Sequence, residues 1–185
     1  MLRRPAATLL TLLLPLLVAC RPAEPPATGP TPPAHDNSEL LLRLVELPEG
    51  MTVVASDAAG ITLDATSDGA QGTVAITVGP HTPAGINLVG EAKRFGEGVA
   101  AAGGTYFGGN QLVTGYGSGY SIRVLHPEGA VEEIRVFLLH PADPDRLLEV
   151  SLGYPPGGAE VTNARMSQLL AVLGAIEPID AETGG

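Results

Sequence analysis

Ser118 has the surroundings closest to those of a catalytic nucleophile, because it lies in the sequence GYGSGY at 115–120. A serine on a nucleophile elbow has glycine two residues before it and two after it. Here those positions are Tyr116 and Tyr120, so the motif is absent. A predicted strand follows the glycines, which also excludes a dinucleotide-binding fingerprint. We interpret the segment as a turn or bulge, with Tyr116, Ser118 and Tyr120 as the alternative candidate for a partner- or ligand-binding loop.

The chain has four histidines, and we predict no metal site and no cofactor. His126 and His140 each precede a proline, but the predicted hairpin places them about ten residues apart along a strand, or roughly 30 Å. One metal ion cannot bridge that distance. His35 falls in a proline-rich segment and His81 in a loop flanked by proline and glycine, so we expect single surface or capping residues there.

Two pairs of close carboxylates are the remaining candidates for chemistry. Asp143 and Asp145 surround a proline, but a calcium loop needs more oxygen ligands and a central glycine, so we interpret them as a polar turn. Glu132 and Glu133 are neighbours on a predicted strand and point to opposite faces, which excludes an acid–base pair. We expect Glu132 to reach water at a projecting hairpin tip; a buried, perturbed carboxylate is the alternative. No catalytic residue is predicted.

Cys20 is the only cysteine, and it closes an apolar N-terminal run that follows Arg3 and Arg4. A positive start, a short apolar stretch and a small residue at the cut predict a secretory signal peptide over residues 1–19. A spanning helix would need about 20 apolar residues, and Pro15 interrupts this run. The sequence LVAC at 17–20 resembles the lipobox of bacterial lipoproteins, in which a peptidase cuts before the cysteine.

The lipobox resemblance implies acyl chains on Cys20 and a membrane anchor that does not span the bilayer. In Gram-negative bacteria an aspartate after the cysteine tends to retain a lipoprotein in the inner membrane. Arg21 stands there instead, which favours the outer membrane, facing the periplasm. The alternative is ordinary secretory cleavage that leaves a free thiol.

Composition excludes two classes of partner. The formal net charge is −10, and loss of the leader with its two arginines makes it −12. Nucleic-acid binding needs basic patches, and anionic lipid repels an acidic surface. Lys93 is the only lysine, and tryptophan is absent. With no second cysteine for a disulfide, stability must come from an aliphatic core.

The chain divides into a tether, one domain and a tail. Six prolines fall between Arg21 and Ser38, so residues 20–38 are predicted to be a disordered tether that carries the lipidated cysteine. Its reach is between about 25 Å and about 55 Å. One globular domain is expected over residues 39–178, followed by a flexible tail at 179–185.

Short strands and two helices are predicted in the domain. Turn residues at LPEGM (47–51) precede the strands, and alternation or β-branched runs define them. The strands are expected at 52–55, 61–65, 73–78, 104–107, 111–116, 120–125, 131–139 and 147–154. A helix over 88–102 has Asn87 as its N-cap, and a second covers 160–176. Their apolar faces are Leu88, Ala92, Phe95, Val99 and Ala102, and Met166, Leu169, Leu170, Leu173 and Ile176.

The hairpin at 120–139 has the most specific predicted register. A three-residue loop with Gly129 in the left-handed conformation would pair His126 with Ala130. Ile122 would then face Ile134, and Arg123 would face Glu133. This register keeps one face apolar, which a sheet with one buried face requires.

The predicted fold class is α+β, a mainly antiparallel sheet covered by two amphipathic helices. The element order, the LPEGM start and the closing sequence LGAI at 173–176 resemble the PsbP-like fold group, which includes DcrB-type envelope lipoproteins. The resemblance implies an α/β/α sandwich. Members mostly act as accessory or assembly factors that bind proteins, and no binding residue of the group matches here.

We therefore expect a lipid-anchored protein of the bacterial cell envelope that acts as a non-catalytic protein-binding or assembly factor. Its partners would be the membrane, through the anchor, and another envelope protein. Two alternatives remain: a small periplasmic hydrolase that uses Ser118 or the Glu132–Glu133 region, and a periplasmic binder of a small ligand or metal.

Overall fold

A computed structural model describes residues 35–67, 69–129, 131–157 and 159–179. The predicted signal peptide, Cys20, most of the tether and the last six residues lie outside the described residues. The fold below is that of the unit Thr31–Gly185. Over the described ranges, neither helix has the length and hydropathy to cross a membrane.

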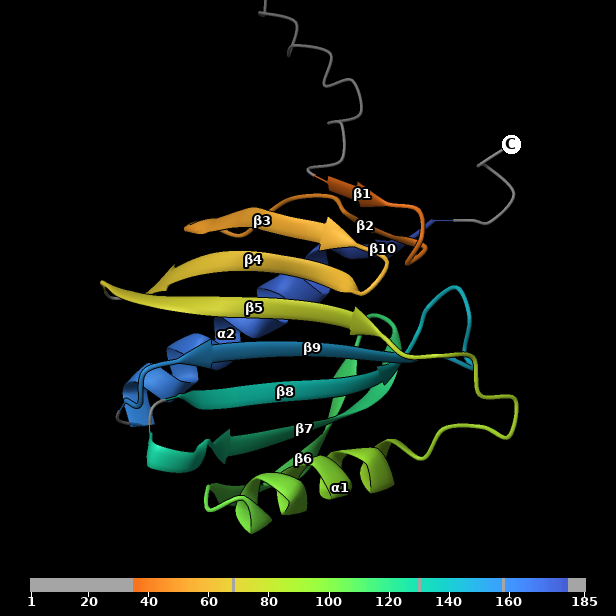
Figure 1. The fold of residues 1–185 in the computed structure, drawn as a ribbon. Coiled ribbons are helices and arrows are strands. Elements are labelled where there is room, and N and C mark those ends of the chain that lie inside the picture. Colours follow the sequence, from red (N-terminus) through yellow and green to blue (C-terminus); the bar gives the residue numbers. More distant parts are fainter. Residues whose placement is uncertain (1–34, 68, 130, 158, 180–185) are drawn as a thin grey trace, which may run out of the picture. The chain divides into compact units, whose positions relative to one another are not determined.

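A seven-stranded antiparallel sheet dominates the unit, in the order β3-β4-β5-β9-β8-β7-β6 (Figure 1). Its strands are β3 (Met51–Asp57), β4 (Gly60–Ser67), β5 (Ala70–Val78), β6 (Thr105–Thr114), β7 (Gly117–Leu125), β8 (Glu132–Leu139) and β9 (Leu147–Tyr154). A small second sheet, in the order β1-β2-β10, consists of β1 (His35–Asn37), β2 (Leu42–Leu44) and β10 (Ile176–Pro178). The helices are α1 (Leu88–Ala101) and α2 (Ala159–Ala175). The predicted α+β class with a large antiparallel sheet is confirmed.

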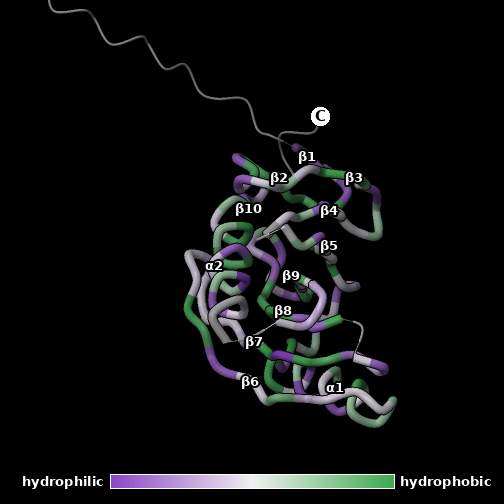
Figure 2. The backbone as a smooth tube through the Cα atoms, turned by 90° about the vertical axis from the view of Figure 1, so that its left-hand side faces the viewer, coloured by the Kyte–Doolittle hydropathy of each residue, from purple (hydrophilic) through white to green (hydrophobic). Residues whose placement is uncertain are grey.

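The two helices lie on opposite faces of the large sheet (Figure 2). Alternation along β8 shows this directly, because Val136 and Leu138 belong to the buried cluster that includes α2, whereas Phe137 belongs to the cluster under α1. The α2 cluster is the larger and extends over β4, β5, β9 and β8. Leu169 and Val172 carry the helix into that core.

Helix α1 covers only the β6, β7 and β8 part of its face. Asn87 caps it as predicted, since its side-chain oxygen accepts a hydrogen bond from the Gly90 amide at 3.0 Å. Phe95 packs at 6.3 Å from Phe137, centroid to centroid. On the same face, β4 and β5 are left open, with exposed polar residues such as Asp64 and Thr73.

The C-terminal end of α2 is held by the small sheet. Ile176 pairs with Leu44 on β2, and the Val45 amide donates to the Ala175 carbonyl at 2.9 Å. Strand β1 begins at His35, inside the segment assigned to the tether from sequence. The side chain of Asn37 holds β1 in place, because its amide nitrogen Nδ2 donates a hydrogen bond to the Ser56 hydroxyl at 2.8 Å.

The predicted hairpin register was wrong by one residue. Arg123 pairs with Ile134, and Val124 pairs with Glu133. The turn is longer than expected, because the His126 amide donates to the Val131 carbonyl and two successive residues have positive φ. The predicted register assumed that one face of this hairpin is exposed to solvent. Both faces are covered here, so a polar residue on either face finds a partner inside the protein.

Two further expectations were wrong. The segments 104–107 and 111–116 were predicted as paired strands, but they form the single strand β6, which bulges between Tyr106 and Gly109 and pairs with β7. Leu170 was placed on the buried stripe of the second helix. It is 43 % exposed, and Val172, at 1 %, takes the core position.

Candidate partner-binding groove on helix α2

Three open hollows follow the outer side of α2. The first, of about 300 Å³, lies between the helix and Val45–Glu49, the second, of about 670 Å³, continues along Ser167 and Gln168, and the third, of about 370 Å³, separates the helix from the β6–β7 turn. We call these hollows together the α2 groove. They border the same turns of the helix, since Ala171 lines the first two and Gly174 lines the first and third.

Small residues on the outer side of α2 create this groove. The buried side carries Met166, Leu169 and Val172, so helical periodicity turns Ala171 and Gly174 outward. A Cβ atom added at Gly174 would meet no atom within 4 Å. The glycine is therefore not required by packing within the described protein. It lowers the helix propensity at that position and leaves the backbone open to close approach.

One wall of the groove is apolar. Val113, at the end of β6, is 81 % exposed, and Leu170 is 43 % exposed; both line the third hollow. Tyr116 lies between them and the core, packed against the α2 cluster. Burial raises the pKa of its hydroxyl, and the carboxylate of Glu177 raises it further. The neutral ring thus extends an apolar surface rather than supplying a reactive phenolate.

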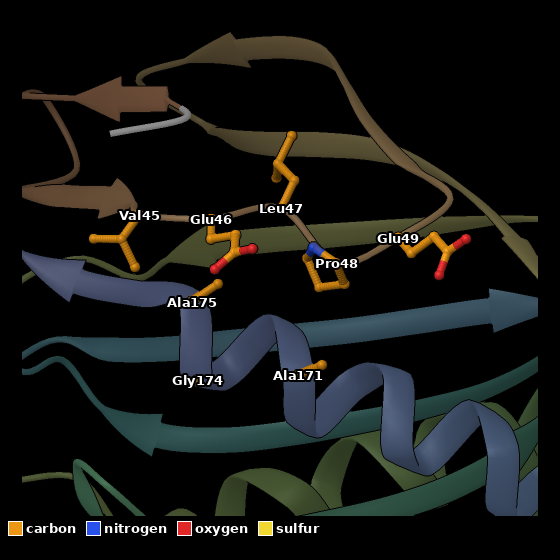
Figure 3. A pocket seen from close by; sticks show the side chains of 8 residues that line it. All are labelled: Val45, Glu46, Leu47, Pro48, Glu49, Ala171, Gly174 and Ala175. Carbon is orange, nitrogen blue, oxygen red and sulfur yellow. The ribbon is translucent and has the colours of Figure 1, made fainter. Parts of the chain in front are cut away.

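The first hollow, on the other flank of α2, has an acidic border (Figure 3). Glu46 and Glu49 are exposed on the loop that lines the first hollow, and neither forms an ion pair in the described part of the chain. In Figure 3 the Glu46 carboxylate and the Pro48 ring lie on the side of the loop facing α2, whereas Leu47 points away from the helix. An elongated segment in the groove would meet apolar side chains on one side and negative charge on the other.

The structure divides the predicted loop of Tyr116, Ser118 and Tyr120. Tyr116 lies in the two-residue turn between β6 and β7, where its amide donates to the Thr114 hydroxyl at 3.1 Å. Ser118 is exposed on β7, and Tyr120 packs under α1, whereas Tyr116 packs against the cluster under α2. The three side chains therefore make no common site, and only Tyr116 belongs to the α2 groove.

The residues named for the hydrolase alternative are occupied by other contacts. Glu132 is 4 % exposed and accepts a hydrogen bond from Arg123 at 2.7 Å, from Thr162 at 3.2 Å and from the Gly157 amide at 3.3 Å. The expectation that it would project into water was wrong, because the N-terminal part of α2 covers the hairpin tip.

Glu133 lies on the opposite face, as predicted, and lies 2.6 Å from both the His126 ring and Arg135. Both glutamates thus form ion pairs with arginines, and these arginines connect β7, β8 and β9. Over the described residues, no hydrogen bond joins Ser118 to a histidine or carboxylate. The geometry gives no support to Ser118 as an activated nucleophile.

Sequence reasoning found both ends of the first hollow without linking them. The LPEGM and LGAI segments supported the fold resemblance, and the structure places them against each other at the mouth of this hollow. The exposed pair Val113 and Leu170 was missed. The sequence carries no signal against Leu170, because with Met166, Leu169 and Leu173 it fits the spacing of a single buried helix face.

Comparisons with known proteins show the fold alone. The cyanobacterial PsbP protein (CyanoP) of Synechocystis sp. PCC 6803 has a similar structure, with a TM-score of 0.50 and 11 % identity over 78 % of this chain and 90 % of that one. A mutant of the protein Mog1 has a TM-score of 0.49 and 12 % identity over 77 % and 93 %. No protein-family model and no curated protein matches the sequence. The PsbP-like fold predicted from sequence is supported by the likeness to the CyanoP structure.

Proposed function

We propose that this protein is a non-catalytic binding or assembly factor of the bacterial cell envelope, which holds a segment of another protein in the α2 groove. The observation that supports it is the groove itself, with exposed Val113 and Leu170 at its third hollow and an acidic loop at its first. Large apolar side chains exposed together on an acidic surface are typical of interaction sites. The three-layer α/β/α arrangement predicted from sequence belongs to this proposal.

The groove defines the chemistry of the partner segment. Open hollows that border both flanks of one helix suit an elongated segment better than a compact small molecule. Its apolar side chains would cover Val113 and Leu170, and its lysines or arginines would face Glu46 and Glu49. Net charge of −10 would favour encounter with a basic segment.

The N-terminal part of the proposal rests on sequence. Cys20 would carry acyl chains, and the proline-rich tether would hold the domain away from the bilayer. Arg21 favours placement in an outer membrane. Anchoring would restrict the groove to partners in the same envelope. The high local concentration there would raise the occupancy of a weak binding site.

A pull-down from detergent-solubilised native membranes tests the proposal. The full chain and its Leu170→Asp variant would be compared, with Thr73→Asp as the matched control because Thr73 is exposed on the open face of the sheet. We expect the same discrete protein to be retained by wild type and control and lost by Leu170→Asp. Loss from all three, or retention by all three, would contradict binding in the α2 groove.

A further inference from the structure

We propose that His81, Asp143 and Asp145 form a site for one divalent cation of the zinc class, at the end of the sheet where β5 leaves and β9 begins. This site is separate from the α2 groove and independent of the proposed function. Sequence analysis predicted no metal site, because it interpreted His81 as a single surface or capping residue and the two aspartates as a polar turn. The structure brings them together although His81 and Asp143 are 62 residues apart.

The three side chains converge from two loops. The His81 Nδ1 atom lies 3.3 Å from Asp143 Oδ2, and its Nε2 atom lies 3.8 Å from Asp145 Oδ2. One ligand atom from each residue lies within 4.8 Å of the other two. Atoms that ligate one tetrahedral zinc ion at about 2.0–2.2 Å lie about 3.4 Å apart. Rotation of these partly exposed side chains, with a single nitrogen of His81 facing the ion, would therefore bring all three to one ion.

The two loops are fixed to each other before any ion binds. The Thr82 amide donates to the Asp145 carbonyl at 2.6 Å, and the Gly79 amide donates to the Leu147 carbonyl at 2.7 Å. Arg146 Nε adds a bond to the Gly79 carbonyl at 2.9 Å. These hydrogen bonds fix the backbone next to each of the three ligand residues. Binding an ion would therefore cost little conformational entropy in the two loops.

Asp143 is oriented by a second contact. Its Oδ1 atom accepts a hydrogen bond from the Asp145 amide at 3.2 Å, which turns Oδ2 toward His81. The buried ring of His140 accepts the Asp143 amide, also at 3.2 Å. Such outer contacts fix the direction of a metal-binding carboxylate.

Charge distinguishes this cluster from an ordinary ion pair. Within the described residues, no lysine or arginine lies within ion-pairing distance of Asp143 or Asp145, and the imidazole of His81 is the basic group that contacts both. The nearby Arg146 directs its Nε atom to a carbonyl. Two carboxylates thus share one imidazole, and a divalent ion would balance their charge. The mixed nitrogen and oxygen ligands favour zinc-class ions over calcium or magnesium, which prefer oxygen alone.

Calorimetric titration of the metal-free full chain in detergent with zinc chloride tests the site. We expect one equivalent of zinc per chain, lost in His81→Ala and weakened at least tenfold in Asp143→Asn and Asp145→Asn. Asparagine keeps the acceptor for the Asp145 amide, so the loop geometry persists. His35→Ala, which removes a histidine far along the sequence, is the control and should bind as wild type.

Cobalt(II) absorption gives a second readout that does not depend on heat, since its visible bands report nitrogen and oxygen ligation. The bands should appear with wild type and be absent with His81→Ala. Absence of zinc binding by wild type, or binding that His81→Ala leaves unchanged, would overturn the site and leave the cluster as an ion pair. Neither outcome bears on the α2 groove, because none of the variants touches it.

Discussion

His140 shows how one buried side chain fastens the N-terminal segment to the sheet. It is 1 % exposed, its Nε2 atom donates to the Leu40 carbonyl at 2.8 Å, and its Nδ1 atom accepts the amides of Ala142 and Asp143. This arrangement requires the neutral ring, since a protonated Nδ1 could not accept. Burial is the main cause that lowers the pKa of His140 below its ordinary value of 6.5.

The lowered pKa of His140 predicts instability in acid. The folded protein resists protonation more than the unfolded chain, so the contribution of His140 is complete above about pH 6.5 and is lost as pH falls through the folded-state pKa. We expect the free energy of unfolding, measured by urea titration, to decrease from about pH 7 to about pH 5. His140→Gln should flatten this slope. If the free energy of unfolding depends on pH equally in both proteins, a group other than His140 causes the loss of stability in acid.

Glu132 is the residue on which the hairpin tip depends. Its carboxylate lies 2.7 Å from Arg123 and 3.9 Å from Arg165, and Arg165 is itself buried with two nitrogens lacking a hydrogen-bond partner. Glu132→Gln keeps the shape and removes the carboxylate charge that balances buried Arg165, whose guanidinium otherwise lies over the Tyr154 ring at 4.7 Å. We expect a loss of about 3–5 kcal/mol in the free energy of unfolding.

The matched control for Glu132 is Glu128→Gln, at the exposed turn of the same hairpin, which should change stability by less than about 0.5 kcal/mol. Urea titration with an unchanged m-value would measure both variants. Similar effects of the two substitutions would show that Glu132 is stabilised by solvent rather than by the arginines.

At the scale of elements, two glycines give opposite expectations. A Cβ atom at Gly72, on β5, would collide with the ring of buried Tyr154, whereas one at Gly174 on α2 would enter open space. Gly72→Ala should lower the free energy of unfolding by about 1–3 kcal/mol, as overpacking does. Gly174→Ala should raise it by about 0.5–1 kcal/mol through helix propensity. Thermal unfolding would compare them, and a destabilised Gly174→Ala would show that α2 needs this glycine itself.

Elements with a single periodic pattern were predictable from sequence. Helix α1 begins at Leu88, after the predicted Asn87 cap, and β9 buries the predicted alternating residues from Leu148 to Tyr154. Local propensity and burial agree in these segments. The hairpin register failed because its turn uses Glu128 in the left-handed conformation, at φ 67°, which few non-glycine residues adopt.

The candidate site was less predictable than the fold. Leu170 follows Leu169 in a leucine-rich helix, and only the tertiary position of α2 decides which of them faces the core. His81 and Asp143 meet because β5 pairs with β9, an antiparallel contact between distant segments. No local pattern encodes either fact, whereas the signals for strands and helices are local.

At the scale of the whole molecule, the proposed role depends on Cys20, which lies outside the described residues. Metabolic labelling with a palmitate analogue should mark wild type and leave Cys20→Ala unlabelled, and the variant should move from the membrane to the soluble fraction. Ser118→Ala controls for acylation of an exposed hydroxyl and should keep the label. A labelled Cys20→Ala, or an intact leader by mass spectrometry, would remove the anchor from the account.

Photo-crosslinking in native membranes tests the central claim most directly, because it reports which face of the domain touches another protein. A photoreactive amino acid would replace Leu170 in the α2 groove and, separately, Thr73 on the open face of the sheet. We expect a single crosslinked protein from position 170 that position 73 does not give. Mass spectrometry should place the crosslink in an apolar segment rich in lysine or arginine. Crosslinks from position 73 alone, or none from position 170, would contradict a partner held along α2.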